Sequence, residues 1–223
     1  MTTLIRVRIK AQIRVQMTVR NKGMNAMPLP SIEYKFCPQC GAPLQNTDFF
    51  GQVRPHCAQC SFVYWGNFSL GVGGVVWHEG KALLVQRAQD PGKGVWTIPG
   101  GYVEQDEPIA QAITREIREE TGIETRPLSL IALRDRPGEK HDAYIVFLLE
   151  YLGGSLKGDP QEVSDLGFFT LEECQALPIA PLSLSLLQAT NKGSNSQTLG
   201  FLPKQGIKML GGPKGVLYQI AED

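Results

Sequence analysis

The sequence predicts an α/β domain preceded by a small cysteine-rich module. Four of the five cysteines form two C-x-x-C pairs within residues 37–60. Further along, strand-like apolar stretches at 69–77 and 81–87 precede residues 109–121, where apolar side chains recur every three or four positions as in an amphipathic helix. Hydrophobic residues make up 42% and charged residues 20% of the chain, which is ordinary for a folded protein and excludes a wholly disordered one.

The N-terminal extension and linker, residues 1–33, are strongly basic. Residues 1–32 hold six Lys and Arg side chains and no acidic one, and apolar and polar residues alternate over 4–20. This alternation predicts a strand with a solvated basic face. An acid-free, Arg-rich start is also typical of organelle-targeting segments. The third interpretation, which we favour, is a dispensable extension. We therefore expect a cytoplasmic protein, with organelle targeting by residues 1–23 left open.

Residues 34–66 hold the paired cysteines, and their spacing is that of a zinc ribbon. The two C-x-x-C pairs are 16 residues apart, within the range typical of a four-thiolate zinc site. A module of this size buries too little apolar surface to fold alone, and a closed four-thiolate site stabilises folding without an open position for catalysis. A redox pair and the replacement of one thiolate by His56 are the alternatives. The expected ligands of a structural Zn²⁺ are Cys37, Cys40, Cys57 and Cys60.

The domain expected over residues 67–190 combines strands with helices. In order, the predicted elements are strands at 69–77 and 81–87 around a turn at 79–80, a short strand at 95–98, a helix at 109–121, strands at 128–134 and 143–151, a short strand at 168–169, and helices at 171–176 and 182–189. Gly122 is expected to end the first helix as its C-cap. The tail, residues 191–223, is rich in glycine, with a final short strand predicted at 216–220. The longest apolar runs fall far short of the roughly 20 residues of a membrane-spanning helix, so no membrane partner is expected.

An acidic centre lies within this domain, although the net charge of the whole chain is zero. Residues 71–175 hold 18 acidic side chains against ten basic ones. Glu116, Glu119 and Glu120 are spaced so that their carboxylates share one face of the predicted helix, where like charges repel. Bound divalent cations would relieve that repulsion, and carboxylates are ligands that such cations prefer. The alternative is a solvated acidic face. Glu107 precedes the helix, where a carboxylate can also act as a cap.

Residues 101–123 match the Nudix box, G-x₅-E-x₇-R-E-U-x-E-E-x-G-U with U aliphatic, at all nine specified positions. The chain resembles the Nudix hydrolases over about residues 35–190, and its cysteine-rich module resembles the N-terminal zinc ribbon of one subgroup. The resemblance implies an α/β/α sandwich around a mixed sheet. It also implies cleavage of nucleoside diphosphates linked to another moiety, with Mg²⁺ or Mn²⁺ bound by Glu116, Glu119 and Glu120.

The same resemblance assigns roles to further residues. Gly101 would bind through its carbonyl or shape the substrate site. Arg115 would orient a catalytic carboxylate and Glu107 would support it. The general base would be one of the helix carboxylates or a carboxylate of a later loop, where we favour Glu162 over Asp165. The expected catalytic residues are therefore Glu107, Arg115, Glu119, Glu120 and Glu162.

The sequence indicates the class of reaction more specifically than it indicates the substrate. Zinc-ribbon Nudix proteins include NADH pyrophosphatases, which carry an S-Q-P-W-P-F-P-x-S signature shortly after the box, and nothing like it follows Ile123. We therefore expect FAD or ADP-ribose, with NADH as the alternative. Aromatic side chains could stack on the adenine or flavin, or belong to the core. The candidates are Phe68, Trp96, Tyr102 and Tyr144, among which Trp96 is expected to bind substrate.

Two other classes of function are alternatives to hydrolysis. A Nudix domain can act as a non-catalytic ligand sensor, but the box is usually eroded in such proteins and it is intact here. Nucleic-acid binding by the ribbon is not expected, because Lys35 and Arg54 are its only basic residues, too few to follow a phosphate backbone. Whether the protein forms a homodimer is left open.

Overall fold

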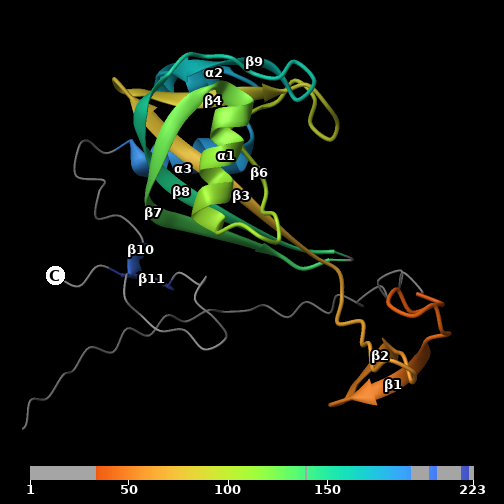
Figure 1. Ribbon diagram of the computed structural model, residues 1–223. Coiled ribbons are helices and arrows are strands. Elements are labelled where there is room, and N and C mark those ends of the chain that lie inside the picture. Colours follow the sequence, from red (N-terminus) through yellow and green to blue (C-terminus); the bar gives the residue numbers. More distant parts are fainter. Residues whose placement is uncertain (1–33, 139, 192–200, 205–216, 221–223) are drawn as a thin grey trace, which may run out of the picture. The chain divides into compact units, whose positions relative to one another are not determined.

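The computed structural model describes residues 34–138, 140–191, 201–204 and 217–220 (Figure 1). The predictions for residues 1–33 and for most of the 191–223 tail lie outside this part of the chain. Within it, no helix combines the length and the apolar character that crossing a bilayer requires.

The cysteine-rich module is built on one antiparallel hairpin. Strands β1 (Gln45–Phe49) and β2 (Gln52–His56) form it. Each C-x-x-C pair lies in a turn at one end of the hairpin, and the two turns share a hydrogen-bond pattern. The amide of Gly41 donates to the carbonyl of Cys37 at 2.9 Å, and the amide of Ser61 donates to the carbonyl of Cys57 at 3.0 Å. The repeated turn brings the two pairs of thiols together.

A mixed sheet forms the centre of the second, larger part. Its strands are β3 (Phe68–His78), β4 (Lys81–Arg87), β5 (Trp96–Thr97), β6 (Gly100–Tyr102), β7 (Ile123–Arg136), β8 (His141–Gly154), β9 (Val163–Phe169), β10 (Phe201–Lys204) and β11 (Leu217–Ile220). The main path runs β11-β10-β7-β8-β3-β4-β5, with β6 beside β3 and β9 beside β4. Strands β3 and β8 are parallel and the other pairings are antiparallel.

Helices cover both faces of this sheet (Figure 1). Side chains of β8 alternate between the faces: Val146 and Leu148 pack in the cluster with α2 (Leu171–Ala176) and α3 (Pro181–Thr190), and Phe147 and Leu149 in the cluster with α1 (Ile109–Thr121). This period of two along the strand puts one apolar row on each face. The arrangement confirms the predicted α/β/α sandwich with a mixed sheet.

The sheet opens between β3 and β4, and this opening positions the Nudix box. The two strands pair only next to their shared turn, at Trp77 with Ala82 and His78 with Lys81. Farther along, β3 pairs instead with β6, which contains Gly100 and the first residue of the box, Gly101. These glycines lie outside the strand that was predicted at 95–98. They form a strand because β3 offers them a free edge.

The other elements differ from prediction mainly in length. Strands β7 and β8 extend beyond the predicted 128–134 and 143–151, because they pair with each other as a long irregular hairpin whose ends are polar. Strand β9 begins at Val163 rather than Phe168, since its polar first half pairs with β4. Backbone pairing thus extends strands past their apolar residues.

Candidate active site

Helix α1 carries the box residues and is fixed by its apolar side. Ala112, Ile113 and Ile117 are buried against the sheet, which leaves the carboxylates on the helix flank. Pro108 precedes the helix with no side-chain cap, so neither Asp106 nor Glu107 acts as one. Gly122 ends the helix in the left-handed conformation at φ 72°, as predicted, and its amide donates to the carbonyl of Arg118.

Glu120 is the most deeply placed carboxylate of the box. Its Oε2 accepts a hydrogen bond from the Gly100 amide at 2.8 Å. Burial above all, together with the nearby charges of Glu116 and Glu162, raises the pKa of Glu120 to about 7 against the lowering effect of the Gly100 amide. The ionised form of such a buried carboxylate is unfavourable without a nearby positive charge, and the Gly100 amide fixes its orientation. Both properties suit it to bind a cation.

Glu116 lies one helical turn earlier, against the backbone of Gly101. Its carboxyl group fills the space that a side chain at Gly101 would need. Oε1 of Glu116 accepts from Nη1 of Arg115 at 2.9 Å. Burial raises the pKa of Glu116, and the charge of Glu119 adds to this effect. Glu116 and Glu120 therefore lie beside the two consecutive glycines of β6.

Arg115 connects the loop of the box to its helix. Its Nη2 and Nε donate to the two oxygens of Glu107 at 2.7 and 3.1 Å, and its Nη1 reaches Glu119 Oε2 at 3.0 Å. Nη2 also donates to the carbonyl of Tyr102. The hydrogen bonds from Arg115 lower the pKa of Glu107. Glu107 thus accepts hydrogen bonds from one side of the guanidinium group, and Glu116 and Glu119 accept hydrogen bonds from the other.

The loop before β9 brings a further carboxylate towards the helix. The amide of Lys157 donates to the carbonyl of Thr121, which ties the loop to the end of α1. The charge of Glu162 is close enough to raise the pKa of both Glu116 and Glu120. Asp165, the less favoured candidate, lies within β9 and accepts from the amide of Leu166.

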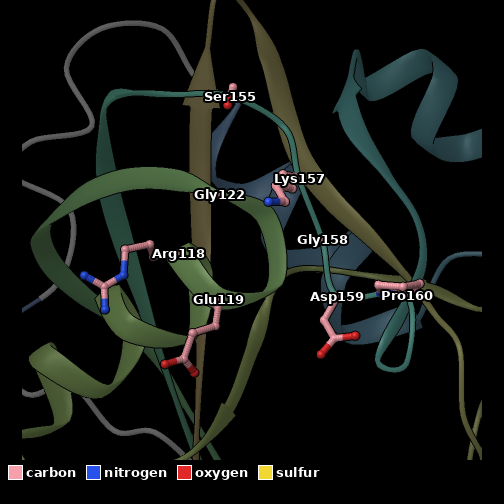
Figure 2. A pocket seen from close by; sticks show the side chains of 8 residues that line it. All are labelled: Arg118, Glu119, Gly122, Ser155, Lys157, Gly158, Asp159 and Pro160. Carbon is pink, nitrogen blue, oxygen red and sulfur yellow. The ribbon is translucent and has the colours of Figure 1, made fainter.

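Figure 2 shows the pocket between this loop and α1. It has a volume of about 450 Å³, and Glu119 and Asp159 lie on its two sides with their carboxylates pointing the same way. Asp159 was not anticipated from the sequence. Its Oδ1 accepts from the amide of Gln161, and its carbonyl accepts from Glu162, so it shapes the turn that presents Glu162.

A second pocket, of about 440 Å³, opens beside the box glycines. It is lined by Gly100 and Gly101 and by three arginines, Arg87, Arg134 and Arg136. No spacing in the sequence indicated these arginines, because they come from the ends of β4 and β7 and meet only in the folded sheet. Asp142 also lines this pocket and pairs with Arg134 and Arg136, so the three guanidinium groups and this carboxylate leave a net positive charge. That charge complements phosphate groups.

The aromatic candidates separate into core and pocket residues. Trp96, predicted to bind substrate, is only 5% exposed and packs edge-on against Phe169 in the core, so this prediction is not retained. Phe68 is exposed and stacks on His141, at the start of β3. Tyr102 and Tyr144 both line the arginine-rich pocket.

The carboxylates of α1 offer oxygen donors of the kind that a hard divalent cation prefers. Neighbouring carboxylates raise the pKa of Glu116 and Glu120, and these two side chains lie against glycine backbone. The cysteines form a different kind of site, with all four sulfur atoms within 4.8 Å of one another. The Sγ separations of 3.4 Å for Cys37–Cys60 and 3.5 Å for Cys40–Cys57 are close to the about 3.8 Å edge of a tetrahedral zinc–thiolate centre.

Comparison with known proteins agrees with this geometry. Residues 67–189 match the model of the NUDIX domain. The chain is 31% identical over 146 residues to an "NAD-capped RNA hydrolase NudC" of Stutzerimonas stutzeri, covering 66% of this chain and 51% of the relative. It is 37% identical over 113 residues to an "ADP-ribose pyrophosphatase" of Methanocaldococcus jannaschii, covering 49% and 66%. The chain thus spans about half the length of the first relative.

Among solved structures, a NUDIX hydrolase from Nitrosomonas europaea has the same fold. It superposes with a TM-score of 0.64 at 24% identity, covering 74% of this chain and 95% of that one. The structural likeness, the domain match and the complete box agree with one another. The chain belongs to the Nudix family.

Proposed function

We propose that the protein hydrolyses the pyrophosphate bond of a nucleoside diphosphate linked to a second moiety. The observation that carries this proposal is the position of the carboxylates Glu116 and Glu120 against Gly100 and Gly101, at the edge of a pocket lined by three arginines. Acidic and basic groups side by side suit a substrate whose phosphates are bound partly through cations and partly through guanidinium groups.

Glu116, Glu119 and Glu120 are the residues that would hold Mg²⁺ or Mn²⁺. Such ions neutralise phosphate charge and make a bound water more acidic. Arg115 would keep Glu116 and Glu119 in place through its hydrogen bonds. The Gly100 amide would keep the second oxygen of Glu120 turned inward.

Glu162 is our candidate for the general base. A carboxylate that takes a proton from water must face the reaction centre without being held by strong partners. Glu162 is exposed, and its charge acts on both Glu116 and Glu120. In the proposed reaction water attacks one phosphorus, its proton passes to the carboxylate, and the bond to the bridging oxygen breaks to give two phosphate-bearing products.

For the substrate we retain FAD or ADP-ribose. A pocket of about 440 Å³ is large enough for one nucleotide half of such a compound, and one relative is named an ADP-ribose pyrophosphatase. A second candidate is an NAD-linked substrate, because the relative from S. stutzeri is named an NAD-capped RNA hydrolase. This second candidate includes a capped RNA, although we expected no nucleic-acid partner.

We also propose that the four cysteines hold one structural Zn²⁺. The backbone amide of Cys60 is the main cause of a Cys57 pKa lowered to about 7, whereas the neighbouring thiols raise the pKa of Cys40 and Cys60. Such crowding of sulfur atoms disfavours several thiolates at once unless a cation lies among them. Four thiolates leave no open position, so the ion would stabilise the hairpin and take no part in hydrolysis. Elemental analysis should find about one zinc per chain, and its absence from protein purified without chelator would contradict this assignment.

The test of the proposed activity is a substrate panel. FAD, ADP-ribose, NADH and an NAD-capped RNA are incubated with Mg²⁺ or Mn²⁺ and their products separated by chromatography. Glu120→Gln should lower the rate by several orders of magnitude, because it removes a charged ligand and keeps the shape. Glu124→Gln, which changes an exposed carboxylate outside the cluster, is the matched control. Turnover after complete removal of divalent cations, or full activity of Glu120→Gln, would refute the mechanism.

A further inference from the structure

Tyr144 occupies a space cleared by three glycines. The Cβ atom of any other residue at Gly71 would lie 2.7 Å from Cδ2 of the Tyr144 ring, and at Gly73 it would lie 2.3 Å from the tyrosine hydroxyl. At Gly100 it would lie 2.9 Å from the same hydroxyl. Two of these glycines are in β3 and one is in β6, and glycine inside a strand often marks a close approach of this kind.

The hydroxyl of Tyr144 is thereby placed at the border between the carboxylates and the arginine-rich pocket. Gly100, against which the hydroxyl lies, donates its amide to Glu120 at 2.8 Å. On the ring, the guanidinium of Arg134 stacks 4.9 Å from the centroid. Tyr144 itself lines the pocket. Burial raises the pKa of Tyr144, and the charge of Glu120 raises it further, so the hydroxyl keeps its proton and is a donor.

We propose that the Tyr144 hydroxyl donates a hydrogen bond to a non-bridging oxygen of the substrate pyrophosphate. The charge of Arg87 acts on both Glu120 and Tyr144, and Arg134 stacks on the tyrosine ring, so a pyrophosphate bound between the α1 carboxylates and these arginines lies beside Tyr144. The hydroxyl is then an uncharged hydrogen-bond donor to the pyrophosphate. It lies between the carboxylates that would hold the cation and the arginines that contact the other end of the pyrophosphate. This inference rests on the proposed function, since it requires the pyrophosphate to lie beside Glu120.

The role differs from the stacking role expected for an aromatic residue in a nucleotide pocket. One side of the ring is covered by the glycine backbone and Arg134 stacks on its face, so the ring has little room for a base. A hydroxyl role is tested by Tyr144→Phe, which keeps the ring and removes one atom. Tyr151→Phe is the matched control, because Tyr151 is on the same strand but packs on His78 in the opposite face of the sheet.

Two measurements separate this inference from the proposed function. Tyr144→Phe should lower kcat/KM on the best dinucleotide substrate by about 10- to 100-fold, as expected for a hydrogen bond to a charged group, with an unchanged Tm. It should also weaken binding of imidodiphosphate with Mg²⁺, a pyrophosphate analogue that is not hydrolysed, by at least about tenfold in calorimetry. Tyr151→Phe should match the wild type in both measurements.

The outcomes are distinguishable. If the wild type cleaves dinucleotides and Glu120→Gln does not, while Tyr144→Phe equals the wild type in rate and in imidodiphosphate affinity, the Tyr144 inference alone is overturned. If no dinucleotide is cleaved but imidodiphosphate binds in a Tyr144-dependent way, the proposed function fails and the hydroxyl remains a pyrophosphate contact. If imidodiphosphate does not bind to the wild type, both are overturned.

Discussion

A Cβ atom on Gly101 would lie 2.4 Å from Cδ of Glu116 and 2.5 Å from each of its carboxylate oxygens. Non-bonded carbon atoms optimally lie about 3.5–4.0 Å apart, so Gly101 and Glu116 can share this space only because the first has no side chain. Gly101, the first residue of the box, must therefore lack a side chain so that the Glu116 carboxylate of the same box can take its position. The two are brought together by β6 pairing with β3 while α1 packs on the same sheet.

Gly101→Ala should therefore act on the chemistry more than on the fold. The methyl group would push the Glu116 carboxylate away by an ångström or more, and a misplacement of about 1 Å can cost about 100-fold in rate. We expect a loss of about that size in kcat/KM and a higher Mg²⁺ concentration for half-maximal activity. Gly138→Ala, whose Cβ would meet nothing closer than 3.5 Å, is the control. Wild-type Mg²⁺ dependence in Gly101→Ala would contradict the steric argument.

Arg115→Lys tests the connection between the box loop and the helix. The guanidinium makes two hydrogen bonds to Glu107 and one each to Glu116 and Glu119, and an ammonium group cannot reproduce this geometry. We expect the free energy of unfolding to fall by about 1–3 kcal/mol and the activity to fall as well. Arg126→Lys, on β7 with a side chain that is 65% exposed, should change neither quantity. Urea titration with activity assays in parallel would detect the difference.

The sequence predicted the fold and the box residues because their signals are local. Helix spacing placed Glu116, Glu119 and Glu120 on one flank of α1, and Gly122 ended the helix as expected. The expectation for Trp96 failed because its packing neighbour is distant in the chain. Trp96 was mistaken for a substrate contact because its neighbour Phe169 joins it only through the packing of the sheet.

The arginines of the pocket illustrate the same limit. Arg87 ends β4, and Arg134 and Arg136 lie near the end of β7. No spacing in the sequence relates them. They line one pocket because β3 separates from β4 beyond their shared turn and pairs with β6 instead. A carboxylate motif on one helix can be predicted from its period, whereas a pocket assembled from separate strand ends requires the tertiary structure.

The pKa of Glu120 predicts how the stability of the metal-free domain depends on pH. It is raised from 4.5 to about 7 in the folded protein, so between these values the folded state binds more protons than the unfolded one. The free energy of unfolding should therefore fall as the pH rises from 4.5 to 7, by roughly 3 kcal/mol for such a shift, and then level off.

Glu120→Gln should abolish this contribution, and Glu124→Gln should keep it. Added Mg²⁺ should also flatten the curve, because a cation can replace the proton that relieves the buried charge. Urea unfolding at several pH values without added divalent cations gives the measurement. A wild-type curve that coincides with that of Glu120→Gln over this range would show that the carboxylate is not desolvated as described.

The two cysteine turns allow a comparison within one molecule. Gly41 and Ser61 occupy equivalent positions, each donating its amide to the carbonyl of the first cysteine of its pair. Both have left-handed backbone conformations, with φ 74° at Gly41 and φ 60° at Ser61. Glycine adopts this conformation without cost, whereas a residue with a side chain loses about 1–2 kcal/mol in it. The second turn is therefore strained where the first is not.

Ser61→Gly should accordingly tighten metal binding by the cysteines, and Gly41→Ala should weaken it. Metal binding and folding of such a module are coupled, so a change of about 1 kcal/mol in turn stability alters the apparent zinc affinity about fivefold. A Cβ at Gly41 would meet no atom within 4 Å, so the alanine variant reports backbone strain without a clash. Competition for zinc with a chromophoric chelator would measure both variants against the wild type. Shifts of the two variants in the same direction would rule out backbone strain as their cause.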